Sequence, residues 1–220
     1  MPEAALALRS FATPREAAAA AAAHIALVAR GAFARHGSFH LAVSGGTTPS
    51  LMFAELAERD LDWTATSIFQ VDERIVAVDD SARNLASLTT ALASHTARIV
   101  PMDVTASNLA ESARRYGERL PERFDLVHLG LGTDGHTASL LPDDPVLESD
   151  DLVAITRPYQ GHARMTLTYR ALARADEILW LVTGREKREA LARLRRGDRT
   201  IPAGRVTAPR SLVMADEAAL

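Results

Sequence analysis

The chain has 220 residues, 47% of them hydrophobic and 24% charged, with a formal net charge of −3 and no cysteine. This length fits one domain, residues 1–220, with a sizeable core, and the lack of cysteine excludes disulfides, thiolate metal sites and a cysteine nucleophile. The charge offers no broad basic surface for nucleic acid, and short apolar runs without a basic N-terminal flank predict a cytoplasmic protein with no membrane span or secretory signal.

The first predicted element is a helix that begins after Thr13 and ends before Gly37. Thr13 is a typical N-cap and Pro14 suits the first helical position. Glu16, three residues after the cap, can close a capping box. The many alanines of this helix are good helix formers, so they need no binding role.

Short apolar strands alternate with helices along the rest of the chain. The strands are predicted at residues 39–43, 67–71, 99–100, 124–129, 152–156, 165–169 and 177–182. The further helices are predicted near residues 51–57, 85–92 and 109–120, with a basic helix that ends near 196. Nearly all-apolar strands separated by helices predict a three-layer α/β fold, Rossmann-like, with a mostly parallel sheet and helices on both faces.

Four polar loops directly follow predicted strands, at residues 44–48, 72–74, 130–136 and 183–187. In open parallel sheets, ligands bind outside the carboxyl ends of the strands. We therefore expect these loops to meet at one crevice.

The loop Ser44, Gly45, Gly46, Thr47 and Thr48 has the features of a phosphate cradle. It offers backbone N–H groups, hydroxyls and the positive end of the following helix. An ordinary strand-to-helix turn would contain the same residue types. The loop lacks the Walker lysine and the dinucleotide glycine spacing, so neither ATP nor NAD is expected.

Charged residues in the other loops allow two interpretations each. Arg74 can bind a phosphate or carboxylate and Asp72 a sugar hydroxyl or a histidine, but the same residues also suit a surface ion pair. Lys187, near a helix start where the dipole disfavours a cation, indicates a bound anion or is an exposed helix lysine. Arg164 is ambiguous in the same way.

Asp134 and His136 alternate along a glycine-rich turn after the strand at residues 124–129. Histidine exchanges protons near neutral pH, so this turn predicts acid–base chemistry on a small molecule. Two such residues are too few for a metal site, so we expect no metal.

Together these motifs resemble the 6-phosphogluconolactonase family, within the glucosamine-6-phosphate isomerase superfamily. They are residues 44–49, 72–74, Asn84, 130–142, 164–168 and 182–187. Arg74 and residues 137–139 favour the lactonase over the related deaminase/isomerase, which normally has tyrosine and an Ile-Ala-Phe-Asn-type stretch there. The chain departs from the lactonase pattern at Arg83, at Tyr159-Gln160-Gly161 in place of a Lys-Pro-Pro-like run, and at Leu141.

The resemblance implies a glucosamine-6-phosphate isomerase-type fold and cofactor-free hydrolysis of 6-phospho-D-glucono-1,5-lactone. His136 would be the general base, Arg74 would stabilise the oxyanion, and Asp72 or Asp134 would orient groups. The glycine loop, Lys187 and Arg164 would hold the phosphate. The expected partner is a small sugar-phosphate lactone, with a monomer favoured. The alternatives are glucosamine-6-phosphate deaminase/isomerase or a non-enzymatic sugar-phosphate-binding protein.

Overall fold

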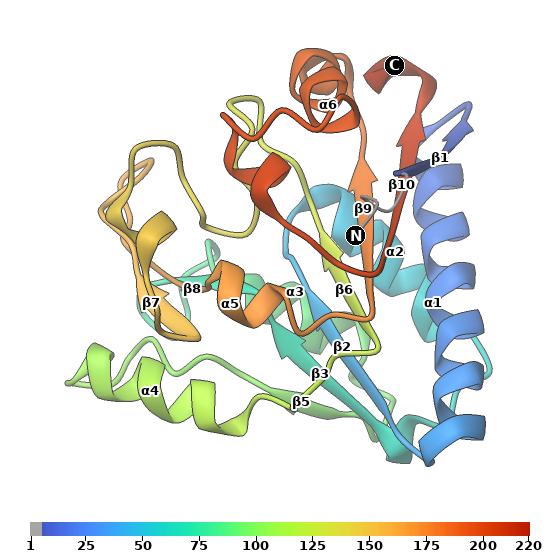
Figure 1. The fold of residues 1–220 in the computed structure, drawn as a ribbon. Helices are drawn as coiled ribbons and strands as arrows, with labels where there is room; N and C mark the ends of the chain where they lie inside the picture. The colour runs from blue at the N-terminus through green and yellow to red at the C-terminus, as the bar shows by residue number, and fades with distance from the viewer. Residues whose placement is uncertain (1–5) are drawn as a thin grey trace.

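A computed structural model describes residues 6–220, which form a parallel sheet between two helical layers (Figure 1). The seven strands follow the order β1-β10-β9-β6-β2-β3-β5, and every recorded pair in this sheet is parallel. Their bounds are β1 (Ala7–Phe11), β2 (Phe39–Val43), β3 (Thr66–Gln70), β5 (Arg98–Val100), β6 (Leu126–Leu129), β9 (Glu177–Val182) and β10 (Arg210–Asp216).

The helices cover both faces of the sheet, as the apolar strands predicted. They are α1 (Pro14–His36), α2 (Thr47–Ala57), α3 (Asn84–Ala91), α4 (Leu109–Arg119), α5 (Tyr169–Leu172) and α6 (Arg188–Arg195). Short 3₁₀ turns are η1 (Trp63–Ala65), η2 (Pro145–Glu148), η3 (Arg185–Lys187), η4 (Pro202–Arg205) and η5 (Glu217–Ala219). Side chains of α1 to α3 share one buried cluster, and those of α4 to α6 share another.

Alternation along the strands separates these two clusters. In β9, Leu179 and Leu181 join the cluster with α1, whereas Ile178, Trp180 and Val182 join the cluster with α4. Successive side chains of a strand point to opposite faces, so a strand buried on both faces must be apolar throughout. The predicted three-layer α/β fold is confirmed.

Local signals at the ends of α1 act as predicted. The Thr13 side chain accepts a hydrogen bond from the Glu16 N–H at 3.2 Å. The Glu16 carboxylate reaches back to the N–H of Ala12, rather than to that of the cap itself. Gly37 ends the helix in the left-handed conformation, with φ 77°, and donates to the carbonyl of Phe33.

The strand order reverses between β2 and β6, which are neighbours in the sheet. From β2 the chain continues to β3 and β5 on one side, while β6, β9 and β10 extend the sheet on the other. Such a switch point leaves a crevice at the carboxyl ends of the strands. The glycine loop follows β2 and the histidine turn follows β6, so both start at this crevice.

A second, antiparallel sheet has the order β4-β8-β7, with β4 (Asp72–Arg74), β7 (Val153–Ile155) and β8 (Arg164–Leu167). The prediction of a loop at residues 72–74 is therefore wrong, because these residues pair with β8. The strands predicted at residues 152–156 and 165–169 exist but belong to this small sheet. Sequence reasoning did not predict β1 and β10.

Helix α1 is long and apolar enough, by length and composition, to cross a membrane, with a mean hydropathy of 1.5 over 18 residues. The sequence analysis expected no membrane span, and α1 meets this criterion by length and composition alone, because alanines between the few charged residues keep the average hydropathy high. In the structure 44% of that window is buried. The buried side chains are Ala17, Ala18, Ala21, Ala22, Ile25, Ala26, Ala29 and Ala32.

Candidate functional site

A polar cavity of about 170 Å³ lies at the crevice and collects residues from all four predicted loops. Three basic side chains and one carboxylate line it, although the chain as a whole is acidic. The lining residues are Ser44, Gly45, Asp72, Arg74, Asn84, Gly130, Leu131, Gly132, His136, Thr137, Ala138, Arg164 and Lys187. The arrangement suits a small anion with hydroxyl groups.

The glycine loop is fixed by contacts on both sides. The Ser44 N–H and hydroxyl both donate to the carbonyl of His128, at 3.2 and 3.3 Å. A Cβ on Gly45 would lie 2.3 Å from Oδ1 of Asn84, so only glycine allows this approach. Thr48 instead bonds Thr183 at 2.7 Å, which ties the loop to the end of β9.

Three predicted loop residues, Gly46, Thr47 and Thr48, do not line the cavity. Gly46 is the N-cap of α2, with φ 123° and no side-chain cap bond. The first N–H groups of a helix lack partners within the helix, and they carry its positive dipole end. The contribution of these residues to an anion site would therefore come through the backbone.

His136 lies on the turn after β6, with its ring held by Asp134. Oδ1 of Asp134 accepts from the ring Nδ1 of His136 at 2.6 Å and from its backbone N–H at 3.0 Å. The turn closes because Gly132 donates to the carbonyl of His136 at 2.8 Å. The side chain of His136 is 22% exposed, so Nε2 is within reach of a ligand.

The surroundings of Asp134 favour its charged form. Burial alone would raise the pKa of this carboxyl, but hydrogen bonds from the His136 backbone and ring, with the ring's charge, lower it below the ordinary value. Asp134 lies behind the ring and does not line the cavity. Its hydrogen bonds hold the ring and the backbone of His136.

Asp72 is buried beside the cavity, with Oδ2 accepting from the Ser139 hydroxyl at 2.6 Å. Burial raises its pKa, and the Ser139 hydrogen bond and the charges of Arg164 and Arg74 offset only part of that effect. The alternative of a surface ion pair is thus excluded for Asp72, since the residue is 7% exposed.

Two arginines lie side by side in the small sheet, because Arg74 in β4 pairs with Arg164 in the neighbouring strand β8. Nη1 of Arg74 donates to the carbonyl of Ala82 at 2.6 Å and to Asn84 at 3.1 Å, which fixes one edge of the guanidinium. Nε of Arg164 is buried without a hydrogen-bond partner among residues 6–220. Both side chains line the cavity and could bind an anion.

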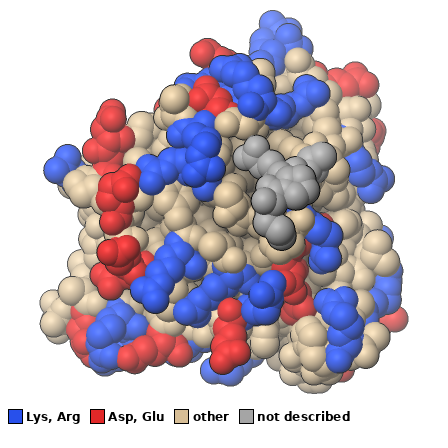
Figure 2. Space-filling view, viewed as in Figure 1, with Lys and Arg blue, Asp and Glu red and all other residues tan. Residues whose placement is uncertain are grey.

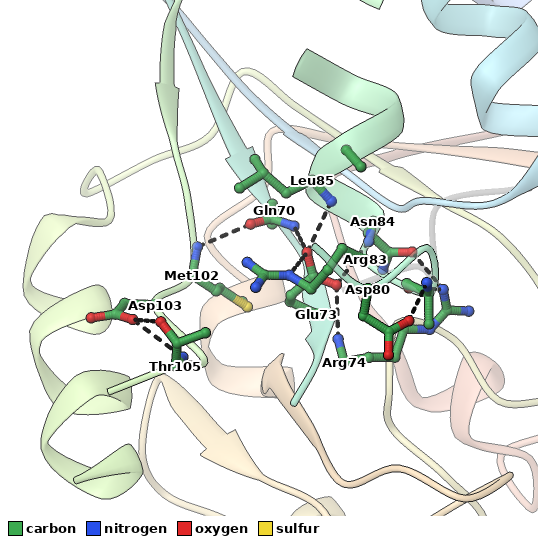
Figure 3. Close-up of polar contacts among 12 residues, drawn as sticks. Gln70, Glu73, Arg74, Asp80, Arg83, Asn84, Leu85, Met102, Asp103 and Thr105 are labelled. Atoms are coloured by element: carbon green, nitrogen blue, oxygen red, sulfur yellow. Dashed lines mark hydrogen bonds and ion pairs between the residues drawn. The ribbon is translucent and has the colours of Figure 1, made fainter. Parts of the chain in front are cut away.

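Glu73, next to Arg74 in β4, holds the residues on this side of the cavity in place (Figure 3). Its carboxylate is fully buried and accepts from the N–H groups of Asn84 and Leu85, at 2.8 and 2.9 Å, at the start of α3. It also accepts from the Gln70 amide and forms an ion pair with Arg83 at 3.3 Å. A carboxylate from β4 thereby caps α3 and holds Asn84 against the cavity.

Lys187 reaches the cavity from η3, at the end of β9. Further basic side chains gather over α6, at the top of Figure 2. Among residues 6–220 no three His, Asp or Glu side chains are grouped to share a metal ion.

Sequence reasoning assigned no role to Asn84, although it stands in a recognised motif, and it missed Tyr159. Asn84 directly precedes a predicted helix, a position where polar side chains often act locally. The hydroxyl of Tyr159 donates to Oδ2 of Asp134 at 3.3 Å. Its sequence signal was an aromatic residue next to Gln160-Gly161, a two-residue turn close to Arg164.

Residues 12–215 match the family described as glucosamine-6-phosphate isomerases/6-phosphogluconolactonase. The chain belongs to this family. Over 177 residues it is 35% identical to a 6-phosphogluconolactonase from Synechocystis, a match that covers 74% of each protein. The family fold is also evident in the crystal structure of 6-phosphogluconolactonase from Thermotoga maritima, with a TM-score of 0.88, 24% identity, and coverage of 96% of this chain and 100% of that one.

Another relative in this family is much longer. The chain is 38% identical over 173 residues to the human GDH/6PGL endoplasmic bifunctional protein, a match that covers 70% of this chain. It spans 22% of the length of that protein. The family description names both isomerase and lactonase, so membership alone leaves the reaction open.

Proposed function

We propose that this protein hydrolyses 6-phospho-D-glucono-1,5-lactone to 6-phospho-D-gluconate, in the oxidative pentose phosphate pathway and without a cofactor. The observation that carries this proposal is a single cavity that holds one accessible imidazole, His136, together with three cations. The relatives named 6-phosphogluconolactonase support the choice of lactone. We further propose that the enzyme acts as a monomer and lies in the cytoplasm.

The phosphate would bind at the Lys187 side of the cavity. Gly45, which precedes the N-cap of α2, offers its backbone N–H, and Lys187 and Arg164 offer positive charge. A phosphate anchored there positions the sugar ring relative to His136.

The reaction needs a base and a place for the oxyanion. With Nδ1–H donated to Asp134, Nε2 of His136 takes a proton from water while the water oxygen attacks the C1 carbonyl. The tetrahedral oxyanion lies against Arg74, whose guanidinium is already held by Asn84. On collapse the bond from C1 to the ring oxygen breaks, and the His136 imidazolium returns its proton to that oxygen.

The test follows the disappearance of freshly generated 6-phosphogluconolactone, corrected for its spontaneous hydrolysis. We expect His136→Ala to lower kcat by about 10²- to 10⁴-fold, the range for loss of a general base, while still binding 6-phosphogluconate. His95→Ala is the matched control, because His95 stacks on Trp63 and does not line the cavity.

Two results would contradict the proposal. One is wild-type protein that does not accelerate lactone loss, and the other is a His136→Ala variant with wild-type kcat. Release of ammonia from glucosamine 6-phosphate would support the deaminase/isomerase alternative. Binding of phosphosugars without turnover would support a sugar-phosphate-binding protein.

A further inference from the structure

Tyr159 stands on a tight hairpin that joins β7 to β8. The residues Gln160 and Gly161 at its tip both have positive φ, 51° and 88°, as a two-residue hairpin turn requires. The Tyr159 N–H donates to the carbonyl of His162 at 2.9 Å, and the Thr156 N–H donates to the carbonyl of Arg164 at 2.8 Å. The hairpin therefore fixes the backbone from which the tyrosine projects.

The side chain of Tyr159 contacts three groups of the candidate site. Its hydroxyl donates to Oδ2 of Asp134 at 3.3 Å. Its ring and the His136 ring meet in a T-shaped arrangement, with centroids 5.6 Å apart and planes at 68°. The Arg164 guanidinium carbon lies 5.1 Å from the centroid of the same ring. One side chain thus contacts both the imidazole and a cavity cation.

The two oxygens of Asp134 have different partners. Oδ1 accepts from the ring and backbone of His136, whereas Oδ2 accepts from Tyr159. The side chain of Asp134 is 32% exposed, so without Tyr159 water would compete for Oδ2 and the carboxylate could rotate. Rotation would release Nδ1–H of His136 and allow the ring to take the other tautomer.

The phenol is suited to remain a donor in this contact. Burial and the negative charge of Asp134 raise the pKa of Tyr159 above its ordinary value. Its proton therefore stays in place at neutral pH.

We propose that Tyr159 is a positioning residue, which locks Asp134 and thereby holds His136 in the tautomer with Nε2 unprotonated, while its ring supports Arg164. The catalytic part of this inference rests on the proposed function. The structural part concerns the imidazole alone and needs no substrate.

The first measurement is the tautomer of His136, observed by long-range ¹H–¹⁵N NMR of the full chain without substrate at a pH where the ring is neutral. We expect the Nδ1–H form to dominate in the wild type and the Nε2–H form to grow in Tyr159→Phe, which removes only the hydroxyl. Tyr169→Phe is the matched control. Tyr169 also has an arginine over its ring, Arg205 at 4.7 Å, but its hydroxyl donates to the carbonyl of Pro202.

The second measurement is turnover of 6-phosphogluconolactone. We expect Tyr159→Phe to lower kcat by about tenfold, as the loss of an orienting partner typically does, with KM changed less than about twofold. Tyr159→Ala should in addition raise KM, because Arg164 loses its aromatic support. Tyr169→Phe should keep wild-type kcat and the wild-type tautomer.

The outcomes separate the two proposals. A Tyr159→Phe variant with the wild-type tautomer would overturn the positioning role, whatever the reaction. Equal loss of kcat in Tyr159→Phe and Tyr169→Phe would also overturn it, because both would then act only through stability. Wild-type protein without lactonase activity would refute the proposed function, and the tautomer would still decide the role of Tyr159.

Discussion

A single buried carboxylate, Asp72, faces the cations of the cavity. It accepts from Ser139 and interacts with the charges of Arg164 and Arg74, yet burial still raises its pKa. In the folded protein its charged form is therefore less favourable than in the unfolded chain. The ionised carboxylate of Asp72 therefore lowers the free energy of unfolding, although it places a negative charge at the site.

This balance predicts a pH dependence for Asp72→Asn. Because the folded-state pKa is raised, the wild type loses stability as pH rises above about 4 toward that pKa, at most about 1.4 kcal/mol per pH unit. The variant cannot titrate here, so its unfolding free energy relative to the wild type should increase with pH and then level off. Urea unfolding from pH 4 to pH 8 measures this difference. Asp150→Asn, at an exposed position, should show no such trend, and a difference that falls with pH would mean that the pKa of Asp72 is lowered.

At the scale of elements, Glu73 connects β4 to the start of α3. Its four described donors are the Gln70 amide and the backbone N–H groups of Arg74, Asn84 and Leu85. It also pairs with Arg83, whose side chain is 6% exposed. The same contacts hold Arg74 and Asn84 at the cavity, so the support of α3 and the geometry of the site have one origin.

We therefore expect Glu73→Gln to destabilise the protein by about 3–5 kcal/mol, the range for breaking a buried ion pair. The new amide would point its own N–H donors at other donors and leave Arg83 without a counter-charge. Urea unfolding at pH 7 is the measurement. Glu118→Gln is the control, because Glu118 pairs with Arg114 at the surface and its loss should change stability by less than about 1 kcal/mol. If Glu73→Gln lowered the free energy of unfolding as little as Glu118→Gln does, the expected contribution of the Glu73 contacts to stability would be contradicted.

At the scale of the molecule, most of the main sheet could be predicted because its strands are short, apolar and separated by turn signals. The four polar segments meet because the carboxyl ends of parallel strands lie at the same end of the sheet, where ligands bind. The small antiparallel sheet could not be predicted, since Asp72–Arg74 is a polar segment whose strand character depends on pairing with β8. Strands β1 and β10 pair across nearly the whole chain length, and no local pattern indicates such a contact.

In the candidate site, too, some features have local sequence signals and others depend on tertiary packing. The turn around His136 and the loop at Gly45 carry strong local signals and lie at the cavity. The partners that fix them, Asn84 and Tyr159, come from other elements and are set by tertiary packing. Glu177, in β9, is another residue whose partners come from distant elements, because it pairs with His24 of α1 and with Arg210 of β10. No local pattern in the sequence names Glu177 as the partner of His24.

At the scale of the whole molecule, α1 is a helix whose length and composition alone would also suit a membrane. In the structure its alanine face packs against the sheet and α2, and the opposite face is exposed. Ala22 is fully buried, whereas the next residue, Ala23, is exposed. The same substitution at these two positions therefore tests the packing.

We expect Ala22→Leu to destabilise the protein by about 1–3 kcal/mol, because the added atoms have no space between α1 and the sheet. Ala23→Leu should change the unfolding free energy by no more than about 0.5 kcal/mol, since its side chain points to solvent. Both variants lengthen an apolar side chain by the same atoms, so helix propensity and overall hydropathy are matched. Urea unfolding of the two proteins compares them directly. Equal effects at the two positions would contradict this layered packing, because only a face pressed against the core distinguishes one alanine from its neighbour.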